Sequence, residues 1–128
     1  IVLGLNTDVN FDKTKIADYI LYISEKLLST QQEHKAIEYL KLGIEILPDN
    51  PGIYEKLAVI YHLNDEFDAA KDIYNSGLKE FPSNASLLLG RALLFIQTGD
   101  TAKACTDLQL SANQGDIDAI NLLEEFCK

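Results

Sequence analysis

Large apolar side chains recur at spacings of three and four residues along most of the sequence. The clearest runs are Ile20, Ile23 and Leu27, then Tyr54, Leu57 and Tyr61. Such spacing places the side chains on one face of an α-helix, and it predicts amphipathic helices that bury this face against a neighbour. We therefore expect helices near residues 12–29, 33–47, 52–63, 67–80, 86–98, 102–113 and 117–127.

Turn-forming residues separate these helices at regular intervals. Residues 48–52 (Pro-Asp-Asn-Pro-Gly) and 82–84 (Pro-Ser-Asn) end one pair of helices and start the next, whereas residues 63–65 and 98–100 turn within a pair. Asn84-Ala85-Ser86 also fits a glycosylation sequon. Because Asn84 stands where a helix needs its N-cap, we interpret it as a cap.

The sequence repeats itself at a shift of 34 residues. The intervals from Ala36 to Ala70 and from Ala70 to Ala104 are both 34 residues. The same shift aligns Leu27, Tyr61 and Phe95, and it pairs Gly43 with Gly77, Pro48 with Pro82, Asn50 with Asn84, and Ala58 with Ala92. This period is typical of arrays of paired helices.

The repeated positions resemble the tetratricopeptide repeat (TPR) family. Its pattern is an aromatic residue, Leu, a small residue and Tyr in the first helix, then Ala and an aromatic residue in the second, then Pro. The middle unit matches throughout, with Tyr54, Leu57, Ala58, Tyr61, Ala70, Tyr74 and Pro82. The first unit is a looser copy with Ile20, Ile23, Ser24, Leu27, Ala36, Leu40 and Pro48, and the third has Leu88, Arg91, Ala92, Phe95, Ala104 and Leu108. The resemblance covers roughly residues 17–128.

The third unit departs most from the pattern. Arg91 replaces the usual Leu, and Asp116 stands where Pro would fall, so we expect the last turn to be built differently. The segment after that turn repeats the first-helix register with Leu122 and Phe126. Its polar residues suit a terminal cap, which must stay compatible with water on its outer face.

These observations predict an all-α fold, a right-handed α-α solenoid of three TPR helix pairs plus a C-terminal capping helix. The predicted units are residues 17–50, 51–84 and 85–118, with the capping helix at 117–127. Residues 12–128 would form a single TPR domain, and residues 1–11 a partly ordered N-terminal extension. The small residues at 24, 58 and 92, and at 36, 70 and 104, are expected where paired helices approach closely.

Composition and charge narrow the function classes. Hydrophobic residues make up 47% of the chain and charged residues 24%, which favours a folded globular protein. The net charge of −9 repels phosphate backbones and argues against nucleic acid as a partner. No apolar run approaches the roughly 18 residues of a membrane span, and Ile1–Leu5 lacks the basic start of a signal peptide. We expect a soluble chain, with a cytoplasmic location favoured and an exported one left open. Because it starts at Ile1, we expect a processed product or a segment of something longer.

No pattern in the sequence indicates catalysis, a metal site or a cofactor. The two histidines are His34 and His62, and nothing in the sequence around either of them resembles a catalytic triad. Cys105 and Cys127 lack the close pairing of zinc ligands. We interpret both cysteines as small apolar fillers. The alternative is a disulfide that closes the final helix onto the third pair. We expect no enzyme activity, no cofactor and no metal.

The TPR resemblance implies which side chains face a ligand. In TPR arrays the first helix of each pair lines a concave surface, and the corresponding positions here form the predicted peptide-binding groove: Leu21, Tyr22, Glu25, Glu55, Lys56, Val59, His62, Leu89, Leu93 and Ile96. The remaining positions of the same kind are Asp18, Leu28, Gly52, Ser86 and Gly90. Lys56 is the one Lys or Arg in this set. That argues against a carboxylate clamp, the TPR subclass that holds acidic C-termini with Lys and Asn.

We therefore expect a protein–protein interaction module that binds a peptide or helix of a partner in an apolar concave groove. An amphipathic segment with Lys or Arg flanks would suit the acidic rim. Residues 1–5 folding back, or a second copy of the chain, are other occupants that the sequence leaves open. The alternative function is a structural spacer or self-association segment of a larger protein.

Overall fold

In the computed structural model, which describes residues 12–128, all regular structure is helical. The helices are α1 (Lys13–Ser29), α2 (Glu33–Ile46), α3 (Pro51–Leu63), α4 (Phe67–Glu80), α5 (Ala85–Gln97), α6 (Thr101–Asn113) and α7 (Ile117–Phe126). Each boundary lies within one residue of the predicted one. The N-terminal extension predicted for residues 1–11 lies outside the described residues.

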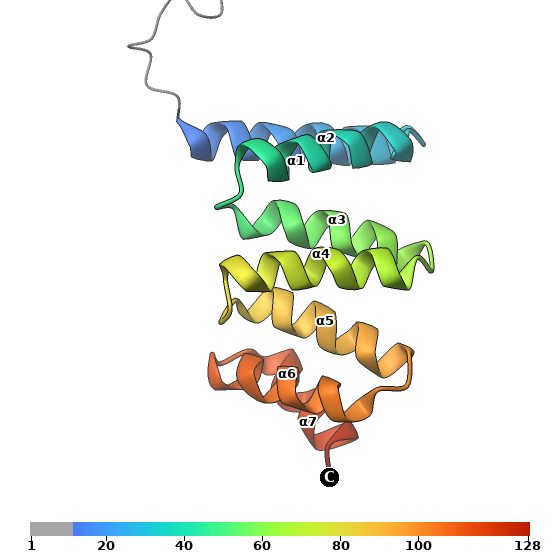
Figure 1. Ribbon diagram of the computed structural model, residues 1–128, viewed down its shortest axis with the longest axis vertical. Coiled ribbons are helices and arrows are strands. Elements are labelled where there is room, and N and C mark those ends of the chain that lie inside the picture. The colour runs from blue at the N-terminus through green and yellow to red at the C-terminus, as the bar shows by residue number, and fades with distance from the viewer. Residues whose placement is uncertain (1–11) are drawn as a thin grey trace, which may run out of the picture.

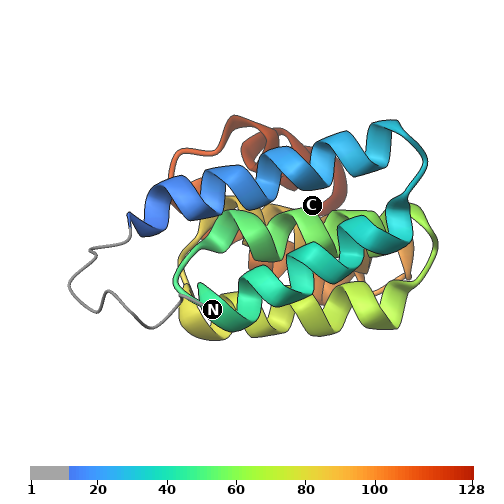
Figure 2. The same ribbon diagram turned by 90° about the horizontal axis from the view of Figure 1, so that it is seen from above.

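The helices stack in chain order along the long axis of the molecule (Figure 1). Within the stack α1 packs on α2, α3 on α4, and α5 on α6, and α7 packs on α6. The first helices also contact one another, because α3 touches both α1 and α5. Seen along the long axis, the successive helices overlie one another (Figure 2). The chain is therefore an all-α solenoid of helix pairs.

The small residues of the repeat are buried inside the helix stack. Ser24, Ala58 and Ala92 on the first helices are completely buried, and so are Ala36, Ala70 and Ala104 on the second helices. The hydroxyl of Ser24 donates to the carbonyl oxygen of Leu21 at 2.8 Å, so this polar group is satisfied inside its own helix. The 34-residue period therefore marks small residues that are fully buried between packed helices.

Replacing Ala70 with leucine is expected to destabilise the fold by about 1–3 kcal/mol, because the added methylene groups have no space between α3 and α4. Leucine at the exposed position of Glu80, on the same helix, is the control and should cost less than about 0.5 kcal/mol. Urea unfolding followed by circular dichroism measures both free energies. Equal costs for the two variants would mean that the helix register is wrong.

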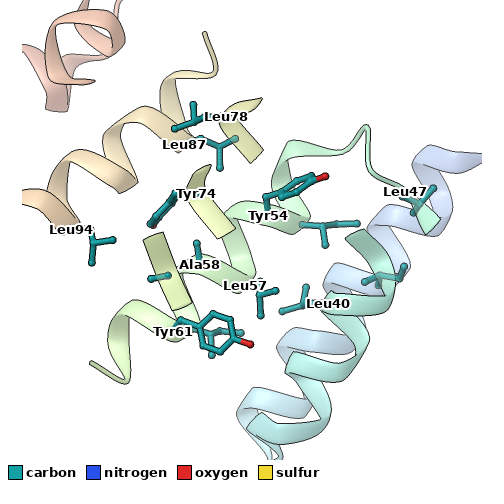
Figure 3. Packing of buried hydrophobic residues seen from close by; sticks show 14 of the residues in the cluster. Leu40, Leu47, Tyr54, Leu57, Ala58, Tyr61, Tyr74, Leu78, Leu87 and Leu94 are labelled. Carbon is teal, nitrogen blue, oxygen red and sulfur yellow. The ribbon is translucent and has the colours of Figure 1, made fainter. Parts of the chain in front are cut away.

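One hydrophobic core runs from α1 to α5. Leu40 of α2 and Leu57 of α3, both completely buried, point toward each other and join the first two helix pairs (Figure 3). Tyr74 of α4 and Leu94 of α5 extend the core into the third pair. A smaller cluster of Ala92, Ala104, Leu108 and Ala119 joins α5, α6 and α7. Each helix thus depends on its neighbour for burial of its apolar face.

Two kinds of turn connect the helices. Between pairs, the side chains of Asn50 and Asn84 accept hydrogen bonds from the N–H groups of Ile53 and Leu87, at 3.3 and 3.0 Å. The N-cap interpretation of Asn84 is confirmed. Within pairs, the three-residue turns place their central residue at positive φ, at Gln31, Asp65 and Gly99.

The turn between α6 and α7 is built like a turn within a pair. It has three residues and places Gly115 at a φ of +88°, where a residue with a Cβ would be strained. Asp116 then caps α7 by accepting from the N–H of Ala119 at 3.0 Å. The expectation of a different last turn is confirmed.

Helix α7 follows the predicted register only in part. Leu122 packs against the smaller cluster as expected, but Phe126 is 39% exposed and Ala119 is the buried residue. The prediction for Phe126 is wrong because the short turn starts α7 at Ile117, two residues before the position that the 34-residue period gives.

Cys105 of α6 and Cys127, directly after α7, form a disulfide. The interpretation of both residues as small apolar fillers is wrong, and the alternative of a bond that closes the last helix is confirmed. Within residues 12–128, helix α7 packs mainly on α6. The disulfide adds a covalent tie to this packing.

Arg91, the residue that departs from the repeat pattern, forms a buried ion pair. Its guanidinium donates from Nε and Nη2 to both carboxylate oxygens of Asp107, at 2.7 and 2.8 Å, and from Nη1 to Asn75 at 2.9 Å. Asp107 is only 3% exposed. The bond therefore links α5 to α6 and α4 at a contact where the pattern usually has leucine.

Candidate functional site

Two adjoining pockets lie along the surface formed by the first helices. One, of about 320 Å³, lies at α3 and α5 and is lined by Glu55, Val59, His62, Leu63, Tyr74, Ser86, Leu89, Gly90 and Leu93. The other, of about 600 Å³, lies at α1 and α3 and is lined by Asp18, Leu21, Tyr22, Glu25, Gly52, Glu55, Lys56 and Val59. Because Glu55 and Val59 line both, the pockets form one continuous depression, which we call the concave groove.

Helical spacing explains why these side chains share a face. On α3, the lining residues 55, 59 and 62 are spaced three or four residues apart. On α5, the lining residues 86, 89, 90 and 93 follow the same spacing. Positions with this spacing project from the same side of a helix. In the part of the chain that the structure describes, no helix covers these side chains, so they line open pockets.

Gly90 allows the floor of the groove to form. A Cβ at this position would lie 2.5 Å from the Tyr74 ring and its hydroxyl oxygen, which is too close for any real contact. The missing side chain lets the ring of Tyr74 reach from α4 beneath α5 and become part of the pocket lining. Glycine at 90 and tyrosine at 74 are therefore a matched pair.

Nearly all residues predicted for the groove line the two pockets. Ile96 is the exception, because it is half-buried and packs against the cluster around Ala104 and Leu108. Leu28, at the same position in the first unit, likewise packs against the main core.

Two lining residues were missed by the sequence pattern. Tyr74 lies on a second helix, which the pattern does not count, although the missing side chain at Gly90 was a signal for it. Leu63 is the last residue of α3, outside the counted positions, and it is 78% exposed. No sequence signal distinguishes it from an ordinary helix end.

The groove exposes large apolar side chains. Tyr22 is 56% exposed, Leu93 41% and Val59 36%, and these residues lie on three different helices. Exposed apolar side chains gathered in one concave surface are typical of sites that bind another molecule. A ligand with an apolar face would remove these side chains from water.

The charged and polar side chains of the groove differ in whether they have a partner. The ammonium group of Lys56 pairs with the carboxylate of Glu25. His62 Nε2 forms a hydrogen bond of 2.5 Å with the amide oxygen of Gln97, and its ring meets Phe67 edge to face. Among residues 12–128, Glu55 has no ion pair or side-chain hydrogen bond. Burial raises the pKa of the Glu55 carboxyl group above its usual value.

The pKa of the Tyr74 phenol is affected by the nearby Glu55 carboxylate. Its pKa is raised to about 12, first by burial of the phenol and then by the nearby charge of Glu55. The phenol therefore stays protonated at neutral pH and remains a hydrogen-bond donor on the groove floor. Within residues 12–128, the centre of the groove thus combines an apolar surface with the Glu55 carboxylate, which forms no ion pair or side-chain hydrogen bond there.

Residues 12–128 form a binding surface, and no catalytic or metal-binding group of side chains is seen among them. His62 is engaged by Gln97, and no nucleophile contacts it. Within residues 12–128, no three His, Cys, Asp or Glu side chains cluster closely enough to hold a metal ion. Over the same residues, no helix has the length and apolar character needed to cross a bilayer.

Comparison with solved structures identifies the architecture. The N-terminal domain of stress-induced protein-1 from C. elegans matches with a TM-score of 0.76 at 16% identity, over 93% of this chain and 100% of that one. The chain has the tetratricopeptide-repeat fold. The TPR resemblance seen in the sequence and the all-α class are both confirmed. No family model matches the sequence, and no curated protein matches it.

Two further TPR structures show the same arrangement. The first TPR of Spaghetti (RPAP3), bound to the HSP90 peptide SRMEEVD, has a TM-score of 0.75 at 18% identity, over 92% of this chain and 94% of that one. A TPR protein from Parabacteroides merdae has a TM-score of 0.66 at 23% identity, over 77% of this chain. The match spans only 40% of the Parabacteroides protein, so a TPR unit of this size also occurs as part of a longer chain.

Proposed function

We propose that residues 12–128 form a protein-interaction domain that binds a peptide or helix of a partner in the concave groove. The observation that carries the proposal is the continuous depression whose lining exposes Tyr22, Val59 and Leu93 on three successive first helices. A similar fold in Spaghetti holds a peptide, which supports the same use of this fold here. The absence of a paired nucleophile and base around His62 favours binding over catalysis.

The ligand that fits is an amphipathic segment. Its apolar side chains would contact Leu21 and Tyr22 at one end and Leu89 and Leu93 at the other. Burying one such side chain contributes about 1.5–3 kcal/mol, so these contacts supply the main favourable term that offsets the entropic cost of association.

Replacing Leu93 with glutamate is expected to weaken peptide binding at least tenfold while costing little stability, because Leu93 is exposed in the free protein and buried in the complex. The probes are peptides selected from a random phage-displayed library on the wild-type domain, resynthesised and titrated by fluorescence anisotropy.

Leu110→Glu is the matched control. Leu110 is 45% exposed, lies on α6 and lines neither pocket of the groove, so the same substitution there should leave binding unchanged. Equal losses in the two variants, or no loss in either, would contradict the proposed groove. Sedimentation of the free domain tests the alternative, since a dimer broken by Leu93→Glu would favour self-association.

A further inference from the structure

Glu55 lies at the middle of the concave groove. It is the acidic residue that lines both pockets, and its side chain is half-buried between the apolar contacts of α1 and those of α5. Val59, one helical turn further along α3, lines both pockets as well. A ligand that spans the groove from Leu21 to Leu93 therefore passes over the Glu55 carboxylate.

The groups around Glu55 supply no positive charge to it. On α3, Lys56 is engaged by Glu25, and His62 by Gln97. On α1, the charged groups facing the groove are Asp18 and Glu25, which are also acidic. Helix α4 contributes the Tyr74 phenol, and α5 contributes Ser86, Leu89, Gly90 and Leu93. Within the described residues, the carboxylate is thus partly removed from water without a compensating cation.

This arrangement has an energetic consequence for ligands. An apolar ligand that covered Glu55 would remove the remaining water from an unpaired charge, which is costly. A ligand carboxylate would add repulsion. A ligand ammonium or guanidinium group would replace the lost water with a charge-assisted hydrogen bond, and such bonds are about twice as strong as neutral ones.

We propose that the partner segment carries a Lys or Arg that binds the Glu55 carboxylate, flanked on both sides by apolar residues that pack on Leu21 and Tyr22 and on Leu89 and Leu93. This inference rests on the proposed function of the groove. It excludes ligands like SRMEEVD, the peptide bound by Spaghetti, whose three acidic side chains would meet Glu55 and Asp18. The groove thereby selects a basic amphipathic segment.

The test compares each selected peptide with a version in which its basic residue is replaced by methionine, an unbranched neutral side chain of similar length. On the wild-type domain the methionine version should bind about tenfold more weakly, the loss expected for one charge-assisted hydrogen bond. On the Glu55→Gln variant the two peptides should bind within about twofold of each other, because the partner of the basic residue is gone.

Asp18→Asn is the matched control for general electrostatics. It removes one negative charge from the same groove, but at an exposed position on the rim. Screening by salt makes exposed charges weak contributors, so this variant should keep the tenfold preference. Glu55→Gln should unfold at the same temperature as wild type or a higher one, because it removes an unpaired half-buried charge. Its binding loss would then not reflect misfolding.

The outcomes separate this inference from the proposed function. Selected peptides that lack Lys and Arg but lose binding to Leu93→Glu would overturn the role of Glu55 and leave the groove intact. That role would also be overturned if replacing the basic residue with methionine weakened binding to Glu55→Gln as much as it weakens binding to the wild type. Peptides unaffected by Leu93→Glu, or a library that yields no binder, would overturn the groove itself.

Discussion

Replacing Asp107 with alanine is expected to lower the free energy of unfolding by about 3 kcal/mol, the low end of the range for breaking a buried ion pair. The substitution removes two hydrogen bonds from the Arg91 guanidinium and leaves its charge between α5 and α6 with Asn75 as its remaining partner. The low end applies because the Arg91 side chain is 23% exposed and water can partly replace the carboxylate. Urea unfolding followed by circular dichroism measures the loss.

A double-mutant cycle isolates the ion pair from the loss of packing. Arg91→Leu alone should also destabilise, since it leaves a buried carboxylate without a partner. Arg91→Leu combined with Asp107→Ala should cost clearly less than the sum of the two single variants, because neither unpaired charge then remains. Strict additivity, or a loss below about 0.5 kcal/mol for Asp107→Ala, would mean that the pair does not hold α5 and α6 together.

Removing the disulfide is expected to destabilise the C-terminal end by about 3 kcal/mol. The bond joins residues 22 apart, and closing a loop of that length restricts the unfolded chain by about this free energy. Because the bond ties the residue directly after α7 to α6, we expect the loss to be concentrated in α7. Hydrogen exchange of the Cys105→Ser, Cys127→Ser double variant should show faster exchange in α7 than in α3.

Reductant provides the internal control for this prediction. It should lower the unfolding temperature of the wild type and leave that of the double variant unchanged. Alkylation followed by intact-mass measurement tests the bond itself. Two labels on the untreated, unreduced protein would show free thiols and contradict the disulfide.

The helices and their packing columns could be predicted from the sequence because they follow from local spacing. A residue such as Ala70 repeats at a fixed interval, and the interval alone places it at a helix contact. The helix ends follow from equally local signals, such as the Asn84 cap. These features require no knowledge of which distant residues meet.

The rest depends on contacts between residues far apart in the sequence. Arg91 was visible as a departure from the pattern, but its partner Asp107 lies 16 residues away on the next helix. Cys105 and Cys127 lie 22 residues apart, and the turn at Gly115 lies between them.

The groove, too, could be predicted only as far as local spacing determines it. Its lining on the first helices follows from helical spacing, so Glu55 and Leu93 could be named in advance. Tyr74 lines the groove from a second helix because Gly90 leaves room for its ring. Ile96 does not line the groove, because it packs against the cluster of Ala92, Ala104, Leu108 and Ala119. Tertiary packing, which no periodicity encodes, decides both cases.

Amide chemical-shift mapping of the labelled domain with a library-selected basic peptide tests the central claim most directly. The groove predicts that the largest shifts fall on Glu55, Val59, Leu89 and Leu93, and that the exposed Tyr39 on α2 and Leu110 on α6 stay unchanged. Shifts concentrated on α2, α4 and α6, with none at Leu89 and Leu93, would contradict binding by the first helices.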